Sequence, residues 1–539
     1  MLKTSRPHLI KRSLIVAVAM LLAVPVAAQD FSTQRLSDGV REIASDAYGG
    51  RWPGTEGERL TLEWLRTQYE AIGLEPGGEN GSWYQEVTLQ RITPAREATA
   101  RWRGNGGQGG ALRLSDGLAL RALASGRYQG EGVPVVFAGY GIHAPERGWD
   151  DYGDVDVRGA VVIVMGGEPD FGTGFPTFYR NARHKEAEAV RRGAVGLITL
   201  VPVNASASNW QQGSRQASST RTTVPGLNSV PLTGIVARDL FDRWASAAGL
   251  RGGDLVAAVS SGGFRAVPLE GVSLSADVEE SIETLTTNNF VARIPGTDLA
   301  DQTIVFSAHW DHVGERGGQI YNGAWDNATG TVGLVEMARE LKAAGAPRRT
   351  IVFLHVTAEE QGLLGAFYYT LNPLYPLETT AANINIDMLP LSPPTRDLQI
   401  FGYGQNTLED DLAVLAAEQG RVITDDGQPE QGFYTRSDHF AFAVRGVPAL
   451  MPWHGVDWVE GGREAGLRAY DQMFRANYHQ PSDIWTPDLD FRAAVQNLEL
   501  LYRLALDLAN SERWPQWKPG SEYAATRALS DDQRRQEPR

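Results

Sequence analysis

The spacing of apolar residues changes along the chain and predicts a different kind of element in each segment. Apolar residues at helical spacing over 60–69 indicate a helix, which the turn-forming segment 73–78 ends. The alternating pattern over 84–101 is typical of strands. A glycine cluster at 104–110 then predicts a loop and a boundary between two units.

The next segment, 115–272, has its own set of predicted elements. Apolar runs indicate strands at 133–138 and 160–165, and a helix over 184–192 leads into a strand over 195–200. No cluster of His, Asp and Glu at ligand spacing occurs here. We therefore expect a smaller α/β unit that covers or extends another part of the protein.

Long apolar runs return in the second half of the chain. A helix is predicted over 329–344 and another over 491–510. Four apolar strands are predicted at 289–294, 303–308, 350–356 and 381–386. The first helix lies between the second and third of these strands, and the other helix follows all four. Near-continuous apolar strands alternating with helices predict an α/β fold, in which a mixed, mostly parallel sheet is covered by helices on both faces. The polar segment 516–539 predicts a loosely ordered tail.

Residues 1–28 have the three parts of an export signal: basic residues, the apolar run 13–24, and small residues at 26–28. A membrane anchor is the alternative, but this run is shorter than the roughly 20 residues that a membrane span needs. Cleavage after Ala28 would leave Gln29 at the N-terminus. We expect a protein exported to the periplasm or the medium, without stable membrane insertion once the signal is removed.

Composition narrows the chemistry. The 539 residues include no cysteine, which excludes disulfides, thiol catalysis and thiolate metal ligands. Removing the signal takes away four of 50 basic residues and no acidic one, which changes the formal net charge from −15 to −19. Such an acidic surface argues against nucleic acid or an anionic membrane as a partner. The oligomeric state stays open.

Several potential metal ligands lie directly after the predicted strands of the second half, where α/β sheets bind ligands. His309 can bind a metal through one ring nitrogen while Asp311, two residues later, accepts a hydrogen bond from the other. His312 is a weaker candidate that would support the site. Asp326 lies in a glycine-containing loop before a helix, and judged alone it is more typical of a helix cap than of a metal ligand.

The remaining candidates are three acidic residues and a histidine. Glu359 and Glu360 are adjacent, so their side chains diverge, and one can hold metal while the other acts as a general base. Asp387 ends an apolar strand, where an unpaired charge is costly; a structural salt bridge is the alternative. His479 lies in a loop that Asp483 would help to set. Two imidazoles and three carboxylates suit a pair of zinc ions that activates water.

Taken together, these motifs resemble the M28 family of zinc peptidases. The segment RWPGTEG at 51–57 is similar to a motif near the start of family members, and the motifs from His309 to His479 occur in family order. The segment 115–272 resembles an inserted protease-associated domain. The resemblance implies a zinc exopeptidase-like domain formed by 29–114 and 273–515.

The resemblance also implies a role for each residue. His309 and Glu360 would hold one Zn²⁺, Asp387 and His479 the other, and Asp326 would bridge the two ions. Glu359 matches the family's catalytic acid/base and Asp311 the aspartate beside the first ligand. Tyr434 matches a tyrosine that stabilises the oxyanion in some aminopeptidases.

The expected reaction is removal of N-terminal residues from peptides by a metal-activated water, with Glu359 as the general base. A carboxypeptidase or a dipeptidase on the same scaffold is the nearest alternative; glutaminyl cyclases are similar but use a single zinc. A non-catalytic binding protein would be expected to lack ligands that this chain retains. Side chains that we expect to line the substrate pocket are Phe433, Trp453, His454 and Trp458.

Overall fold

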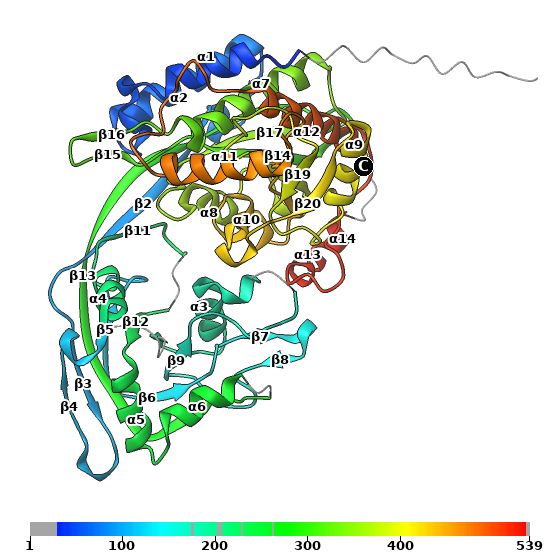
Figure 1. The fold of residues 1–539 in the computed structure, drawn as a ribbon. Coiled ribbons are helices and arrows are strands. Elements are labelled where there is room, and N and C mark those ends of the chain that lie inside the picture. Colours follow the sequence, from blue (N-terminus) through cyan, green and yellow to red (C-terminus); the bar gives the residue numbers. More distant parts are fainter. Residues whose placement is uncertain (1–29, 174–176, 202–206, 228–229, 261–262, 535–539) are drawn as a thin grey trace, which may run out of the picture.

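The structure is a computed structural model that describes residues 30–173, 177–201, 207–227, 230–260 and 263–534. The predicted signal peptide lies outside these residues. Within the described part of the chain, no helix is long and apolar enough to cross a membrane. Figure 1 shows two bodies of unequal size, joined along one side by the long curved strand β13 (Val267–Ile294).

The larger body is built on a sheet that is parallel at its centre. Its parallel strands are, in spatial order, β21 (Ala449–Leu450), β18 (Thr380–Asn385), β14 (Leu299–His309) and β17 (Arg349–Val356). β13 pairs antiparallel with β17, and β2 (Tyr84–Pro94) pairs antiparallel with β13. Two short strands extend this edge: β1 (Glu75–Pro76) on β13 and β11 (Arg221–Thr223) on β2.

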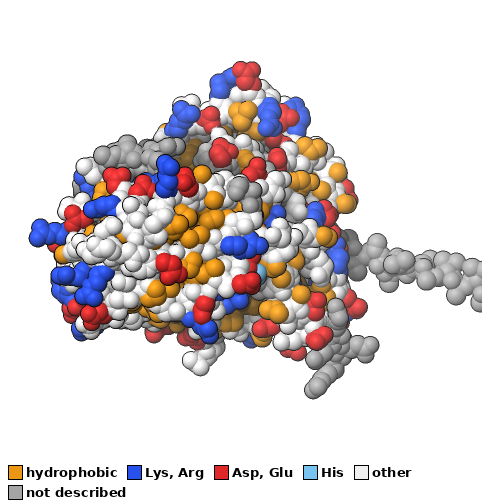
Figure 2. Space-filling view, turned by 90° about the horizontal axis from the view of Figure 1, so that it is seen from below, with side chains coloured by type: hydrophobic (Ala, Val, Ile, Leu, Met, Phe, Trp, Pro, Cys, Tyr) orange, Lys and Arg blue, Asp and Glu red, His pale blue; other side chains and the backbone are white. Residues whose placement is uncertain are grey.

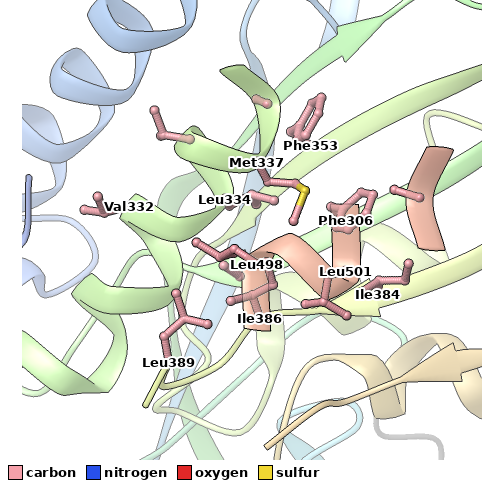
Figure 3. Packing of buried hydrophobic residues seen from close by; sticks show 14 of the residues in the cluster. Phe306, Val332, Leu334, Met337, Phe353, Ile384, Ile386, Leu389, Leu498 and Leu501 are labelled. Carbon is pink, nitrogen blue, oxygen red and sulfur yellow. The ribbon is translucent and has the colours of Figure 1, made fainter. Parts of the chain in front are cut away.

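Helices cover both faces of this sheet, as the apolar pattern predicts. One face packs against α1 (Thr33–Ile43), α2 (Glu56–Ile72), α7 (Thr329–Ala343), α9 (Leu408–Glu418) and α12 (Arg492–Asn510). The other packs against α8 (Leu364–Leu371), α10 (His439–Ala443) and α11 (Gly462–Asn477). Figure 3 shows Phe306 and Phe353 of the sheet packed close to Met337 of α7 and Leu501 of α12. The predicted α/β fold class is confirmed.

The smaller body has a second sheet, in which β13 also takes part. From β13 outward its strands are β6 (Arg127–Phe137), β9 (Val161–Met165), β10 (Gly196–Leu200), β12 (Leu232–Val236) and β5 (Leu118–Arg121). The helices of this body are α3 (Ala182–Arg191), α4 (Ala207–Ala217), α5 (Arg238–Ala247) and α6 (Gly252–Val259). Its hydrophobic core is separate from that of the larger body and includes Phe137, Ile163, Phe241 and Trp244.

The predicted limits of the smaller unit, 115 and 272, do not coincide with the ends of the second sheet. β3 (Thr99–Arg103) and β4 (Gly109–Leu112) lie before residue 115, yet they form a hairpin in the second sheet. The glycine cluster therefore makes a hairpin turn within the smaller body. β13 crosses the predicted limit at 272 without interruption. The assignment of this unit as a protease-associated domain stays a prediction.

The segment after Lys518 is more ordered than its polarity predicts. It contains α13 (Ala524–Ala528) and α14 (Asp531–Arg534). Arg527 is buried and donates to the carbonyls of Leu377 and Thr380 at 3.2 and 2.9 Å. The aromatic ring of Tyr523 packs against Trp517. Arg527 and Tyr523 thus attach the segment to the larger body. The polar composition of the segment gave no sign of these buried contacts.

Two short antiparallel strand pairs and one short parallel pair lie outside the two large sheets. They are β7 (His143–Ala144) with β8 (Trp149–Asp150), β15 (Gly314–Arg316) with β16 (Gln319–Tyr321), and β19 (Asp397–Ile400) with β20 (Val422–Asp425). Acidic and basic side chains alternate over the face seen in Figure 2, so this face carries no large patch of a single sign.

Candidate metal centre

The five predicted ligands meet at the carboxyl ends of the central parallel strands. His309 is the last residue of β14, Glu360 follows β17, and Asp387 follows β18. Parallel strands end at the same edge of a sheet, so their following residues lie close together. Asp326 comes from the irregular turn Ala324–Ala328 before α7, and His479 from the loop after α11.

Their side-chain atoms form two groups that share Asp326. In the first group, His309 Nε2 lies 3.4 Å from Asp326 Oδ1 and 3.2 Å from Asp387 Oδ1. In the second, His479 Nε2 lies 3.1 Å from Asp326 Oδ2 and 3.0 Å from Glu360 Oε2. Each oxygen of Asp326 therefore faces a different histidine.

These separations fit metal ligation. Two ligands of one tetrahedral zinc ion lie about 3.4 Å apart, because each zinc–ligand bond is about 2.0–2.2 Å long. The four distances above, 3.0 to 3.4 Å, are close to this value. The donor set of two imidazoles and three carboxylates suits zinc, and each carboxylate oxygen of Asp326 faces a different group of ligands.

The grouping corrects one sequence-based assignment. His309 is beside Asp387 and not beside Glu360, and His479 is beside Glu360 and not beside Asp387. The reason is that β14 and β18 are neighbours, which places the residues at their ends side by side. Glu360 lies beyond Asp326, on the side of the site that the loop after α11 approaches.

The outer oxygen of each terminal carboxylate is held by a protein group. Ser437 Oγ donates to Asp387 Oδ2 at 2.5 Å, and Asn385 Nδ2 donates to Ser437 Oγ at 2.7 Å. His312 Nδ1 lies 2.6 Å from Glu360 Oε1. The Ser437 contact is a hydrogen bond, and the contact of His312 with Glu360 is a close ion-pair contact, shorter than the separation of two ligands on one metal. His312 thus has the supporting position that the sequence predicts.

The protonation of these groups reflects their mutual contacts. Burial alone would lower the pKa of His479, but hydrogen bonds with Asp326 and Glu360 raise its pKa to about 10. Burial would raise the pKa of Glu360, yet His312 and His479 bring this pKa down to about 2. The carboxylates therefore stabilise positive charge at this point, which is the condition that a bound cation requires.

Glu359 lies between the histidines and the rim of the site. Its Oε2 is 4.0 Å from His309 Nε2, and its side chain is 12% exposed. Burial raises the pKa of Glu359 well above its usual value and outweighs the opposite effect of His309. Glu359 is therefore a carboxyl group that holds a proton more readily than an exposed one does.

Asp311 has a different partner from the predicted one. His309 Nδ1 bonds the backbone carbonyl of Asp311 at 3.1 Å, whereas the Asp311 carboxylate is 3.9 Å from that nitrogen. The carboxylate instead accepts the backbone N–H of Glu359 at 3.0 Å. Burial raises the pKa of Asp311 to about 7. Asp311 thus fixes the backbone of the Glu359 turn as well as the orientation of His309.

Two further residues hold the loop of Asp326 in place. The carboxylate of Asp483 accepts the backbone N–H groups of Trp325 and Asp326 at 2.8 and 3.1 Å, in agreement with its predicted role in setting a loop. Gly323 has φ +59°, and a Cβ here would lie 2.5 Å from the ring of His312. Only glycine allows His312 to approach the loop this closely.

Arg51, from the RWPGTEG segment, joins the N-terminal helices to the site. It is fully buried and donates to the carbonyls of Ile43, Trp310, Asn322 and Gly323 at 2.6 to 3.0 Å. Two of these carbonyls belong to the loop before Asp326, and Trp310 follows His309. Burial lowers the pKa of Arg51 to about 10, which leaves it charged at neutral pH.

We predict that Arg51→Leu lowers the free energy of unfolding by about 3 to 5 kcal/mol, because it leaves several buried carbonyls without a donor. Urea unfolding followed by fluorescence measures this change. Arg59→Leu is the matched control, because Arg59 is an exposed arginine of α2 that contacts only Glu56 and Glu63, and little effect is expected there. An unchanged unfolding midpoint for Arg51→Leu would contradict the prediction.

A small pocket leads to Glu359 and to the first group of ligands, His309, Asp326 and Asp387. It has about 20 Å³ of space, enough for one water molecule. Phe433 and Trp453 line it as predicted, together with Arg436, a candidate carboxylate-binding residue that the sequence could not place, and Tyr478, to which the sequence assigned no role. Arg436 Nη2 donates to the hydroxyl of Tyr478 at 3.0 Å. The one sequence feature that could have indicated a role for Tyr478 in the pocket is its position directly before the predicted ligand His479.

Three residues predicted to face the substrate do not line this pocket. Tyr434 is buried among His439, Phe440 and Tyr523, which contradicts its predicted contact with an oxyanion. His454 lies behind Trp453, with its Nε2 2.6 Å from the carbonyl of Met388. Trp458 is half-buried and bridges to Thr395.

Comparison with known proteins agrees with this geometry. Residues 289–503, which include all five ligands and Glu359, match the sequence model described as peptidase family M28. These residues belong to peptidase family M28. The M28 region thus contains every side chain of the two ligand groups, whereas Arg51 and the smaller body lie before it.

The chain is also similar to individual peptidases. The probable lipoprotein aminopeptidase LpqL of Mycobacterium tuberculosis is 23% identical over 458 residues, which cover 82% of this chain and 78% of that protein. The probable leucine aminopeptidase 2 of Aspergillus oryzae is 29% identical over 40% of this chain and 44% of its own length. The mouse aminopeptidase NAALADL1 is 32% identical over 22% of this chain and 16% of its own length.

Among solved structures, similarity extends over most of the chain at low sequence identity. The aminopeptidase from Aneurinibacillus sp. strain AM-1 has a TM-score of 0.45 and 16% identity, and the match covers 89% of this chain and 94% of that one. The zinc aminopeptidase BSAP from Bacillus subtilis has a TM-score of 0.42 and 18% identity, with 92% and 99% covered.

Proposed function

We propose that this protein is an exported di-zinc aminopeptidase that removes N-terminal residues from peptides. The observation that carries the proposal is the pair of ligand groups that share Asp326, with Glu359 beside them. His309, Asp387 and one oxygen of Asp326 would hold the first ion. His479, Glu360 and the other oxygen of Asp326 would hold the second. Membership of the M28 region in a peptidase family supports hydrolysis of a peptide bond.

Zinc ions in such a site lower the pKa of water and polarise a carbonyl group. The protein supplies the proton transfers and the binding of charge. Glu359, whose raised pKa suits a proton acceptor, takes a proton from the attacking water and passes it to the leaving amine. The Tyr478 hydroxyl, held by Arg436, lines the pocket and would donate to the oxygen that becomes negative as the peptide carbonyl is attacked.

The similarity to two probable aminopeptidases supports an aminopeptidase over a carboxypeptidase. Arg436 lines the pocket and forms no salt bridge with the described residues, so a carboxypeptidase that binds a substrate carboxylate there is the second candidate. The two reactions differ in the end of the peptide that they require. An N-acetyl group blocks only the first, and a C-terminal amide only the second.

The deciding experiment measures hydrolysis of leucine p-nitroanilide and of a tripeptide in free, N-acetylated and C-terminally amidated forms. We expect cleavage of the anilide and of both tripeptides with a free amine, with loss of activity in a chelator and recovery with zinc. Cleavage of the N-acetylated tripeptide at an unchanged rate would exclude an aminopeptidase. N-terminal sequencing of the mature protein tests export, and Gln29 is the expected first residue.

We predict that His312→Ala weakens zinc binding about 10- to 100-fold at one of two sites, because the outer oxygen of Glu360 loses its donor. Competition with a coloured chelator measures both affinities. His312→Gln keeps a donor and is expected to recover part of the loss. Unchanged affinities in His312→Ala would show that His312 does not support the metal site.

A further inference from the structure

A large cavity lies between the two bodies, lined by β12 of the smaller sheet and by β2. It has a volume of about 910 Å³, far larger than the pocket beside the metal ligands. Thr233 and Ile235 of β12 line it on one side and Arg91 of β2 on the other. Its wall also includes Arg183 of α3 and Arg221 of β11. Both bodies therefore contribute to this cavity.

The lining carries an excess of positive charge. Four arginines line the cavity, together with the single acidic residue Glu186. Arg121 is neutralised by Glu280 at 2.7 Å and Arg91 by Glu283 at 3.2 Å, but Arg183 and Arg221 form no salt bridge with the described residues.

Both of these arginines remain charged at neutral pH. Burial lowers the pKa of Arg183 to about 10, and burial also lowers that of Arg221. Arg183 is partly engaged, since it donates to the carbonyl of Gly362 at 3.1 Å and lies over the ring of Phe367. Arg221 has no such contact and carries the freer charge. Arg221 is exposed to solvent at the wall of the cavity, and a guanidinium without a carboxylate partner can bind one through two parallel hydrogen bonds.

The cavity borders the turn that carries Glu359 and Glu360. Gln361, the residue after Glu360, lines the cavity, and so does Leu364 at the start of α8. Trp52, the neighbour of the buried Arg51, lines it as well. One wall is therefore made by the same turns that hold Glu359 and the Asp326 loop. Glu359 lines the small pocket and Gln361, two residues later, lines this cavity, so the same short turn borders both spaces.

We propose that this cavity holds the trailing part of the peptide substrate and that Arg221, assisted by Arg183, binds its terminal carboxylate. This inference rests on the aminopeptidase function proposed above and specifies the substrate class as short peptides with a free carboxyl end. The protein as a whole is acidic, with a formal net charge of −15. A cationic cavity in an acidic molecule attracts an anionic group to this one place.

The test compares short peptides that have a free carboxyl end with the same peptides as C-terminal amides, for lengths of two to six residues. The wild-type protein is expected to cleave the acid about tenfold more efficiently than the amide at its preferred length, as measured by kcat/KM. In Arg221→Gln this ratio is expected to fall to nearly one, through a higher KM for the acid. Arg221→Lys keeps the charge and is expected to retain part of the preference.

Arg215→Gln is the matched control, because Arg215 is an exposed arginine of α4 that does not line the cavity. It is expected to keep the wild-type ratio. A ratio near one in the wild-type protein, or an equal ratio in Arg221→Gln and the wild type, would overturn the inference.

A binding measurement separates this inference from the proposed reaction. Hydrolysis of leucine p-nitroanilide tests the aminopeptidase function alone, because the anilide has no trailing peptide. Calorimetry with the wild-type protein and an N-acetylated tripeptide acid, with its amide as the comparison, tests the cavity alone. The acid is expected to bind about tenfold more tightly than the amide and to lose this advantage in Arg221→Gln. Equal binding of acid and amide would contradict the cavity proposal whatever the anilide shows.

Discussion

Glu359→Gln is expected to lower kcat by about three to four orders of magnitude while zinc content stays at two ions per chain. The reason is that Glu359 lies 4.0 Å from His309 of the first ligand group but belongs to neither group. Glutamine has nearly the same shape and cannot accept the proton of the attacking water. Steady-state kinetics with leucine p-nitroanilide, together with elemental analysis of the dialysed protein, measures both quantities.

The neighbouring glutamate provides the control for this prediction. Glu360 lies 3.0 Å from His479 and belongs to a ligand group, so Glu360→Gln is expected to lose zinc from one site. The two substitutions are chemically identical and one residue apart. If Glu359→Gln kept most of its activity, or if it lost zinc as Glu360→Gln is expected to do, Glu359 would not be the general base.

The second large effect is expected for Asp326→Ala, which should lose both zinc ions and all measurable activity. Each oxygen of Asp326 lies 3.1 to 3.4 Å from a different histidine, so one substitution removes a ligand from both groups. Removal of the carboxylate also leaves two imidazoles without their shared negative partner. Elemental analysis and the shift of Tm on addition of zinc measure the loss.

Asp387→Ala serves as the comparison for Asp326→Ala. Asp387 contacts His309 and Ser437 but neither His479 nor Glu360, so its removal is expected to affect one site only. Full zinc occupancy in Asp326→Ala, or loss of only one ion, would contradict the bridging position. A smaller loss in Asp387→Ala than in Asp326→Ala would support it.

Local patterns were sufficient for the sheet and for the choice of ligands. The apolar strands at 303–308, 350–356 and 381–386 all lie in the central sheet, and the side chains of the five predicted ligands lie within 3.0 to 3.4 Å of one another in two groups that share Asp326. Both predictions depend on features near in sequence, namely the run of apolar residues and the polar residue at its end. Strand order then brings those residues together.

The directions of side chains were harder to predict. Which carboxylate lies beside which histidine depends on the neighbours of β14 and on the path of the loop after α11, and no local pattern contains this information. Tyr434 and Tyr478 illustrate the same limit. Both lie in segments with aromatic and polar residues, but the ring of Tyr434 packs under Tyr523 while Tyr478 reaches the pocket.

β13 is a further feature that the sequence did not indicate, because its 28 residues alternate between buried and exposed without marking a change of sheet. Because β13 is hydrogen-bonded in both sheets, it connects them rigidly. Large rotation of one body about the other would break a ladder at several places, which is costly. The two walls of the cavity, one from β2 and one from β12, are therefore held at a nearly constant separation by the covalent and hydrogen-bonded continuity of β13.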